Sequence, residues 1–222
     1  MNDEQIEPER WLAVDALLDA LLLEEDPALR EALADSRAAG LPPIELSAQS
    51  ARLLYLLTRI AGARRVLEIG TLGGYSTIGL ARGVGPEGSV VTLERSARNA
   101  EIARHNFQRA GVADRVDIVV GAALDTLPRL SGDFDLVFVD ADKENNSAYL
   151  GWAIELGRPG TVVVVDNVVR AGRILDPGAE DLQARAVRDM LEMMGAHPRL
   201  EAAAIQTLGA KGWDGLAVAR VR

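Results

Sequence analysis

The sequence predicts an α/β protein with a Rossmann-like, seven-stranded, mostly parallel sheet, helices on both faces and an antiparallel C-terminal hairpin. Three observations predict this fold class. Short β-rich runs alternate with helical stretches, as in repeated β-α-β units. Several runs are continuously apolar, which is typical of parallel strands buried on both faces. After the fifth run, two more β-rich segments flank a loop that contains glycine.

The first elements are helical. Apolar residues recur at helical spacing from Trp11 to Leu23, and Pro27 opens a second helical piece, Ala28 to Ala39, before Gly40. The 222 residues, with 48% hydrophobic content, are enough for one substantial core. We therefore expect a single domain, in which residues 1–43 are a helical lead-in and residues 44–222 form the core that binds the ligands.

Five strands follow, each bounded by glycine or an acidic residue: Arg65 to Gly70, Ser89 to Glu94, Val116 to Val120, Phe134 to Asp140 and Thr161 to Asp166. The helices expected around them are Ser47 to Ile60, Tyr75 to Arg82, Ser96 to Ala110, Ala123 to Leu130, Asn145 to Leu156 and Asp181 to Met194. The two segments expected to pair as an edge hairpin are Leu200 to Ile205 and Trp213 to Val221.

Composition excludes several function classes. A formal net charge of -9 argues against nucleic-acid binding, which depends on Lys and Arg neutralising phosphates. With no cysteine, the chain has no disulfide, no thiolate nucleophile and no Cys-ligated zinc, so a metal needs oxygen ligands or the two histidines. The segment Met1 to Glu9 is acidic and shows no targeting signal, and charge interrupts every long apolar run. We expect a cytoplasmic protein that binds small molecules and no membrane.

The first strand runs into a glycine-rich turn, where the backbone can approach a ligand. Its spacing, Glu68-x-Gly70 followed by Gly74, is not the Gly-x-Gly-x-x-Gly of dinucleotide sites, and an acid inside the turn would repel phosphate. Glu68 suits a cationic ligand, such as the amino or sulfonium group of S-adenosylmethionine. Glu94, which ends the second strand, suits the two hydroxyls of an adenosine ribose. The alternative is a tight turn flanked by two solvated acids.

Oxygen-bearing side chains end the fourth and fifth strands. Asp140, Asp166 and Asn167 offer two anionic oxygens and one neutral one, a set that suits Mg²⁺, with Mn²⁺ or Ca²⁺ as alternatives. Asp142 is better explained as a helix cap acting through Asn145. Burying two carboxylates side by side is costly unless a cation joins them.

Lys143 follows Asp140 by three residues, within reach of a substrate oxygen on the same ion. A neighbouring divalent cation favours a neutral amine, which suits a general base; the alternative is a surface lysine that offsets local acidity.

The remaining chemistry-bearing side chains have structural interpretations. His105 and His197 are expected to be structural or surface histidines. Trp152, Trp213 and Tyr149 either line an aromatic acceptor pocket or pack in the core and at the sheet edge.

Three stretches together resemble the class I cation-dependent O-methyltransferases, the family of the catechol and caffeoyl-CoA O-methyltransferases. They are Val66 to Thr77, Phe134 to Lys143 and Val165 to Val168. The resemblance implies cofactor contacts by Leu46, Glu68, Gly70, Thr71, Ser76, Glu94, Ala122 and Asp140. It also implies a metal on Asp140, Asp166 and Asn167, and catalysis by Lys143 with Asp140. The implied reaction moves a methyl group from S-adenosylmethionine to a hydroxyl of a vicinal-diol aromatic small molecule.

The chain departs from the family in two places. The segment before the first strand, Leu46 to Ala51, lacks the family's acidic residue and glycine, and the loop Gln206 to Lys211 lacks the acidic residue that touches a substrate hydroxyl in catechol enzymes. The acceptor's identity is therefore not fixed by the motifs.

Two other function classes stay open at this point. A dinucleotide-dependent oxidoreductase shares the strand, glycine turn and ribose acid but needs the absent phosphate fingerprint. A non-catalytic module would bind a partner through the helices from Trp11 to Ala39, which we interpret instead as a homodimer interface or an active-site cover.

Overall fold

The computed structural model describes residues 8–222, so the segment for which the sequence predicts no targeting signal lies largely outside the described residues. One seven-stranded sheet runs through it in the order β3-β2-β1-β4-β5-β7-β6. The strands are β1 (Arg65–Ile69), β2 (Ser89–Glu94), β3 (Val116–Val120), β4 (Phe134–Val139), β5 (Gly157–Asp166), β6 (Leu200–Gly209) and β7 (Gly212–Val221). Strands β1 to β5 pair in parallel, and β7 pairs antiparallel with both β5 and β6. The predicted fold class is confirmed.

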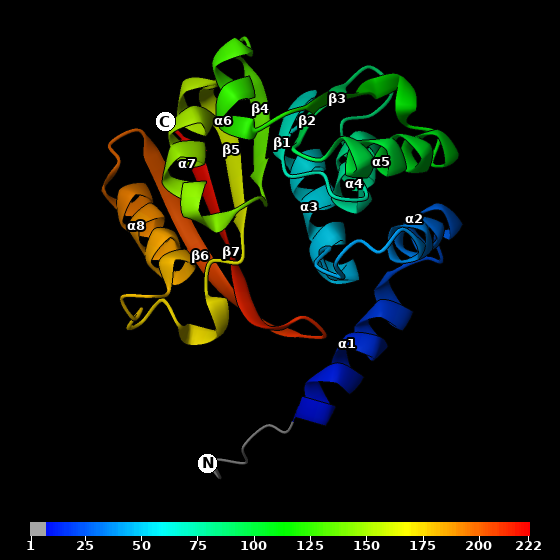
Figure 1. Cartoon of the computed structure of the whole chain (residues 1–222), viewed down its shortest axis with the longest axis horizontal. Helices are drawn as coiled ribbons and strands as arrows, with labels where there is room; N and C mark the ends of the chain where they lie inside the picture. Colours follow the sequence, from blue (N-terminus) through cyan, green and yellow to red (C-terminus); the bar gives the residue numbers. More distant parts are fainter. Residues whose placement is uncertain (1–7) are drawn as a thin grey trace.

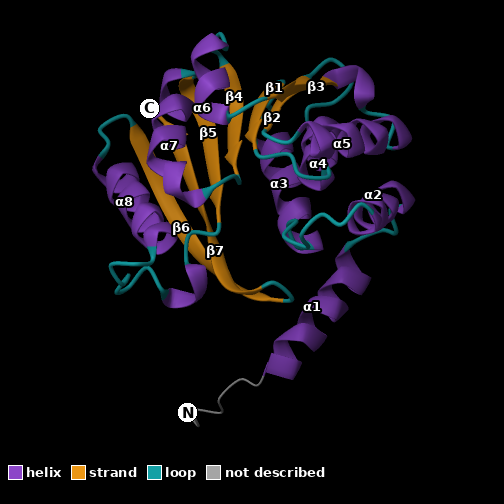
Figure 2. Cartoon of the chain, viewed as in Figure 1, coloured by secondary structure: helices purple, strands orange, loops and turns teal. Residues whose placement is uncertain are grey.

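Helices cover both faces of the sheet (Figure 1 and Figure 2). The α-helices are α1 (Pro8–Leu22), α2 (Pro27–Ala38), α3 (Ala48–Ile60), α4 (Tyr75–Gly83), α5 (Ala97–Arg109), α6 (Ala123–Thr126), α7 (Asn146–Glu155) and α8 (Leu182–Ala196). The short 3-10 turns are η1 (Ala113–Arg115), η2 (Leu127–Arg129), η3 (Lys143–Asn145) and η4 (Arg170–Gly172).

Alternation along the strands divides the core between these two layers. Leu67 and Ile69 of β1 pack in the cluster that includes α7 and α8, whereas Val66 packs in the cluster that includes α3, α4 and α5. Successive side chains of a strand point to opposite faces, so both faces of the parallel strands are apolar. This burial explains the continuous apolar runs in the sequence.

Helix starts follow ordinary capping chemistry. The Ser47 hydroxyl accepts a hydrogen bond from the amide of Ser50 at the start of α3, and Ser96 does the same for Asn99 at the start of α5. Asp181 accepts from the amide of Ala184 and so begins α8. No helix among residues 8–222 is long and apolar enough to cross a membrane.

Some boundaries differ from the expected ones. The helix expected to reach Leu130 ends at Thr126 and continues as the 3-10 turn η2, because Pro128 cannot continue the α-helical hydrogen bonds. Strand β5 begins at Gly157 rather than Thr161, and β6 extends to Gly209 rather than Ile205. In both cases pairing with a neighbouring strand extends the β structure into residues with weak β preference.

Candidate active site

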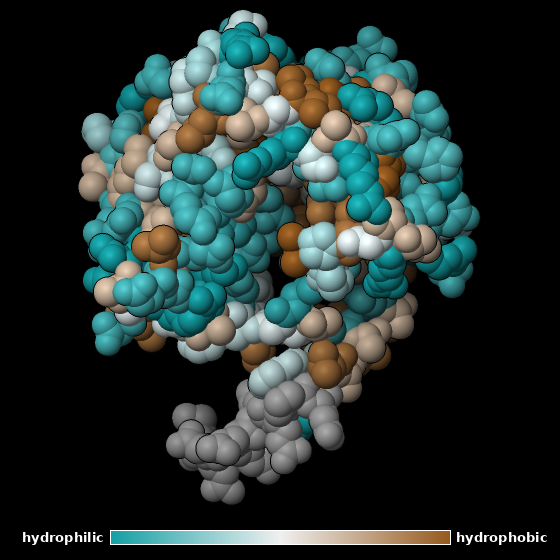
Figure 3. All heavy atoms as spheres, viewed as in Figure 1, coloured by the Kyte–Doolittle hydropathy of each residue, from teal (hydrophilic) through white to brown (hydrophobic). Residues whose placement is uncertain are grey.

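The candidate site lies where the chain leaves neighbouring strands in opposite directions. Strand β1 is followed by β2 on one side of it, and β4 lies on the other side. Ligands of open α/β sheets bind beyond the carboxyl ends of such strands. A cavity of about 960 Å³ opens there and reaches Glu94 after β2, Asp140 after β4 and Asp166 at the end of β5. Figure 3 shows this face of the molecule hollowed near its centre.

The glycine-rich turn brings the end of β1 against the end of β4. Gly70 has a φ of +104°, and a Cβ placed on it would lie 2.2 Å from the carbonyl oxygen of Asp140. Gly74 has a φ of +87°, and its added Cβ would lie 2.4 Å from the ring of Phe107. Both positions require glycine, because a side chain would meet the backbone or a core ring. The turn therefore borders the cavity with bare backbone.

Glu68 lies beneath this turn and not on the cavity wall. Its carboxylate is fully buried and accepts hydrogen bonds from Ser76 Oγ at 2.6 Å, from Thr92 Oγ1 at 2.6 Å and from Thr77 Oγ1. Burial raises the pKa of Glu68 to about 7, against the lowering effect of these hydroxyls. The sequence predicts that Glu68 acts on a cationic ligand either directly or through water. Glu68 does not line the cavity, whereas Ser76, which donates a hydrogen bond to it, does.

Glu94, which the sequence predicts to be a ribose ligand, lies at the end of β2 and borders the cavity. Its carboxylate accepts from the amides of Leu72 and Ser96, each at 2.8 Å. Each carboxylate oxygen has two acceptor positions, so capacity for further donors remains. Leu46, Gly70 and Thr71 also line the cavity.

Ala122, expected near an adenine, is exposed at the start of α6 and is not among the cavity-lining residues.

Two carboxylates meet at the other end of the cavity. Burial raises the pKa of Asp166 above its usual range, the nearby charge of Asp140 raises it further, and Lys143 opposes the shift. Asn167 adopts a left-handed φ of +62° directly after β5 and lines the same cavity. Two acids and one amide oxygen match the donors preferred by a hard divalent cation. No cluster of three or more His, Cys, Asp or Glu side chains with metal-binding geometry occurs among residues 8–222.

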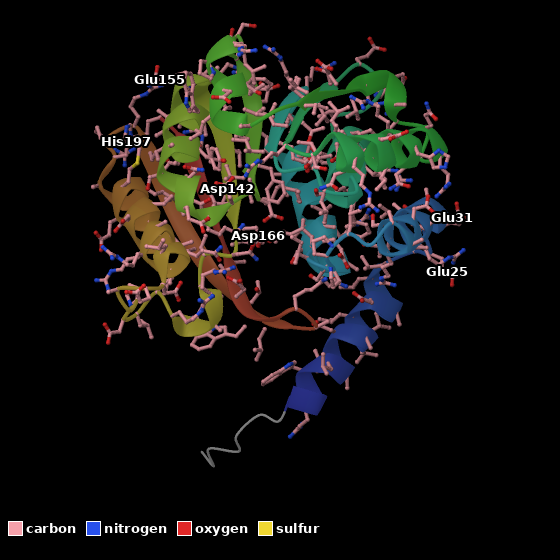
Figure 4. All side chains as sticks on the ribbon, in the orientation of Figure 1. Glu25, Glu31, Asp142, Glu155, Asp166 and His197 are labelled. Carbon is pink, nitrogen blue, oxygen red and sulfur yellow. The ribbon has the colours of Figure 1, made fainter. Side chains whose placement is uncertain are left out.

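Lys143 is buried beside these acids. Its Nζ lies 2.8 Å from Oδ1 of Asp140, and the residue is only 7% exposed. Lys143 is therefore not a surface lysine, although its positive charge does offset the neighbouring acids, as the alternative interpretation expected. Asp142 instead accepts hydrogen bonds from Asn145 and from the Tyr149 hydroxyl, the latter at 2.6 Å. Figure 4 shows Asp142 and Asp166 on the same side of the molecule, toward its centre.

The aromatic side chains lie outside the site or at its margin. Tyr149 is buried, and Trp152 lies in a separate small depression between α7 and α8. Trp213 is exposed on β7, where its Nε1 donates to Gln206 Oε1 at 2.7 Å. His105 is exposed on α5, and His197 follows α8 outside the cavity. The structural interpretation of the histidines and of Tyr149 is confirmed.

Sequence reasoning missed several cavity residues that distant segments contribute. The amide of Ala210, at the tip of the β6–β7 hairpin, donates to Asp15 of α1 at 2.7 Å. Lys211 Nζ lies 3.1 Å from Glu45 Oε1. Asp214 Oδ1 accepts from the amides of Val169 and Arg170, each at 3.0 Å. For Asp214 the only signal in the sequence was its position before a glycine near the start of β7. Ala210, Lys211, Asp15 and Glu45 carried no such signal.

Comparison with known proteins finds consistent matches. A family model described as O-methyltransferase matches residues 20–220. A catechol O-methyltransferase of Mycobacterium tuberculosis is 63% identical over 94% of this chain and 95% of its own length. An O-methyltransferase of Bacillus cereus, solved with S-adenosylhomocysteine, is 47% identical with a TM-score of 0.95, covering 97% of this chain and 100% of that one. A Streptomyces achromogenes O-methyltransferase of tomaymycin synthesis, solved with S-adenosylmethionine, is 46% identical with a TM-score of 0.94, covering 97% and 99%.

Proposed function

We propose that this chain, which belongs to the O-methyltransferase family and is an S-adenosylmethionine-dependent O-methyltransferase, needs a divalent metal ion. In this proposal it transfers the methyl group to a hydroxyl of a vicinal-diol aromatic small molecule. One observation carries the proposal. Asp140, Asp166 and Lys143 come together at one end of a cavity whose other end holds Glu94. The two alternatives, a dinucleotide-dependent oxidoreductase and a non-catalytic binding module, find no support beside this family membership.

The proposal assigns the cofactor to the end of the cavity formed by β1 and β2. Glu94 would accept the ribose hydroxyls, and the bare backbone at Gly70, with Thr71 and Leu46, would line the methionine and adenosine parts. Ser76 would face the cofactor while Glu68 holds its hydroxyl from below. Ala122 stays a proposed neighbour of the adenine, and its exposure at the edge of the sheet leaves it accessible to a ligand.

The proposal assigns a divalent cation, Mg²⁺ first and Mn²⁺ or Ca²⁺ next, to Asp140, Asp166 and Asn167. The raised pKa of Asp166 supports it, because two acids forced together in a partly buried place gain from a shared cation. When bound, such an ion stabilises the ionised form of an oxygen that it holds.

Lys143 and Asp140 perform the proton transfer in this proposal. Asp140 holds the Lys143 amine at 2.8 Å, and the burial of Lys143 fixes it within the cavity. The amine accepts the proton of the acceptor hydroxyl. The oxygen then forms a bond to the methyl carbon as the carbon–sulfur bond breaks, leaving S-adenosylhomocysteine and a methyl ether. Positioning donor and acceptor in line supplies a large share of the rate.

We also propose that the protein is cytoplasmic and forms a homodimer; an inverted pattern of exposure on α1 supports the dimer. The partly buried residues Asp15 and Asp19 contact the protein's own hairpin tip and α3, whereas Leu17, Leu21 and Leu22 point away and are more than half exposed. A helix that only covered its own chain would bury the leucines and expose the acids. A second copy of the chain would cover the leucines.

Metal removal tests the proposal. The protein is incubated with S-adenosylmethionine and a 1,2-dihydroxybenzene, and methyl ether is quantified with Mg²⁺, with EDTA, and with EDTA followed by excess Mg²⁺. We expect product with Mg²⁺, loss with EDTA and recovery on replenishment. A monohydroxybenzene serves as control, because it lacks the second oxygen. Unchanged turnover in EDTA would refute the metal dependence.

A further inference from the structure

Arg170, a residue that the proposed reaction does not use, lies in the wall of the same cavity. It follows Asn167 by three residues and lines the cavity together with Gln183 of α8. We propose that Arg170 binds a carboxylate carried by the acceptor, so that the preferred acceptors are diol aromatics with an acidic substituent. This inference rests on the proposed function and specifies its substrate class.

The backbone around Arg170 is held in an unfavourable conformation. Arg170 has a φ of +55° and Ala171 a φ of +54°, a region that side-chain-bearing residues seldom adopt. Asp214 holds this turn by accepting the amides of Val169 and Arg170. Such conformations are energetically unfavourable and concentrate at ligand sites. The turn places Arg170 three residues after Asn167, the last of the proposed metal ligands.

Among the carboxylates of residues 8–222, none forms a close ion pair with the guanidinium of Arg170, although its charge helps to lower the pKa of Asp181. Arg170 Nη2 donates to Gln183 Oε1 at 2.6 Å, and its buried Nε has no hydrogen-bond partner. By contrast, Arg82 and Arg173 are both paired with aspartates. A partly buried cation with an unused donor is costly, and a bound anion would satisfy both the charge and the donor.

A carboxylate fits this position better than other anions. The planar guanidinium offers two parallel donors, which match the two oxygens of a carboxylate. Asp166 and Asp214 lie nearby and would repel a doubly charged phosphate more strongly than a singly charged carboxylate. The cavity of about 960 Å³ has room for an aromatic acceptor beside the cofactor.

The test compares 3,4-dihydroxybenzoate with its methyl ester in the wild-type protein and in Arg170→Gln, with saturating S-adenosylmethionine and Mg²⁺. The measured quantity is the ratio of kcat/KM for the acid to that for the ester. Charge-assisted pairs of this kind correspond to about tenfold to a hundredfold in binding. We expect the ratio to fall by that factor in Arg170→Gln, mainly through KM, and partial retention in Arg170→Lys.

Binding gives a readout independent of turnover. Calorimetric titration of both compounds into the protein with S-adenosylhomocysteine and Mg²⁺ is expected to show the same loss of preference for the acid. Gln183→Glu places a carboxylate beside Arg170 from a regular helical position, so it is expected to weaken acid binding without altering the strained turn. Arg185→Gln, an equal charge change at an exposed site of α8, is the matched control and is expected to keep the wild-type ratio.

An unchanged acid-to-ester ratio in Arg170→Gln and Gln183→Glu, or an equal fall in Arg185→Gln, would overturn the role of Arg170 while leaving the methyl transfer intact. Methylation of neither compound by the wild-type protein with Mg²⁺ or Mn²⁺ would instead refute the diol chemistry of the proposed function.

Discussion

The buried amine of Lys143 is the side chain best placed to accept a proton in the cavity. Replacing it with Met keeps an unbranched apolar stem in the buried position and removes the amine. We expect kcat to fall by about 10² to 10⁴, the usual contribution of a general base. The deficit should shrink at high pH, where the acceptor ionises without help. Initial rates from pH 6 to 10 measure both effects.

Calorimetry with S-adenosylmethionine is the control for Lys143→Met, because the proposed ribose ligand Glu94 ends β2, and β1 separates it from β4. The affinity should stay within about twofold of wild type, on the order of the ±0.5 kcal/mol of an independent site. Full turnover by Lys143→Met across the whole pH range would remove Lys143 from the proposed chemistry.

Glu68 makes the stability of the cofactor-free protein depend on pH. Its pKa rises from 4.5 to about 7 on folding because the carboxyl is fully buried. Between these two values the unfolded chain loses this proton while the folded protein keeps it. The stabilisation is therefore complete below pH 4.5 and is lost as the pH rises through 7.

The glutamine of Glu68→Gln cannot ionise, so this variant is expected not to lose the stabilisation as the pH rises. The unfolding free energy of Glu68→Gln minus that of the wild type should increase by about 3 kcal/mol as the pH rises from 4.5 to above 7. Urea denaturation at several pH values from 5 to 8.5 measures it. Glu87→Gln, at an exposed position before β2, should give a constant difference. Parallel curves for Glu68→Gln and wild type would show that Glu68 ionises normally in the fold.

At the scale of elements, the contact between the ends of β1 and β4 depends on Gly70. Its φ of +104° disfavours any other residue, and an added Cβ would lie 2.2 Å from the Asp140 carbonyl. Gly70→Ala is expected to destabilise the protein by about 2–4 kcal/mol, from backbone strain and overpacking together. Turnover should also fall, by more than the loss of folded protein accounts for, because the segment that would move is the end of β4, which is followed by Asp140.

Gly62→Ala is the matched control for Gly70→Ala. Gly62 also has a positive φ, +59°, but its added Cβ meets nothing within 4 Å, so only strain of about 1 kcal/mol is expected. Urea denaturation of both variants, together with turnover, isolates the steric part. Equal losses in the two variants would mean that β1 and β4 do not need the close approach.

The strands show which features of the fold could be predicted from the sequence and which could not. The apolar runs of β1, β4 and β5 and the motif residues at their ends were predictable, because buried parallel strands need such residues and the motifs are local. The early start of β5 was not, since Arg158 and Pro159 have weak β preference. The Thr161 hydroxyl holds that segment by donating to the Phe134 carbonyl at 2.6 Å and accepting the Arg158 amide.

At the scale of the whole molecule, segments that are far apart in the sequence come together to line the cavity. Asp15 meets Ala210, Glu45 meets Lys211 and Asp214 holds the turn at Arg170. Such pairings depend on where the β6–β7 hairpin ends and how α1 leaves the body, as Figure 1 shows. No local pattern encodes them, so the cavity residues at the ends of the strands could be predicted, and those contributed by α1 and the β6–β7 hairpin could not.

The outward leucines of α1 give the last prediction, on the assembly of the chain. Leu17 and Leu21 are 56% and 68% exposed, although Asp15 and Asp19 of the same helix contact its own chain. Sedimentation at micromolar concentration is expected to give twice the 23.7 kDa of one chain. Leu17→Glu combined with Leu21→Glu should give single chains, because burying two carboxylates in an apolar interface is costly. Leu175→Glu combined with Leu182→Glu, at exposed positions elsewhere, should stay dimeric. A wild-type protein that sediments as one chain at these concentrations would contradict the dimer, because a second copy of the chain would then not cover the leucines of α1.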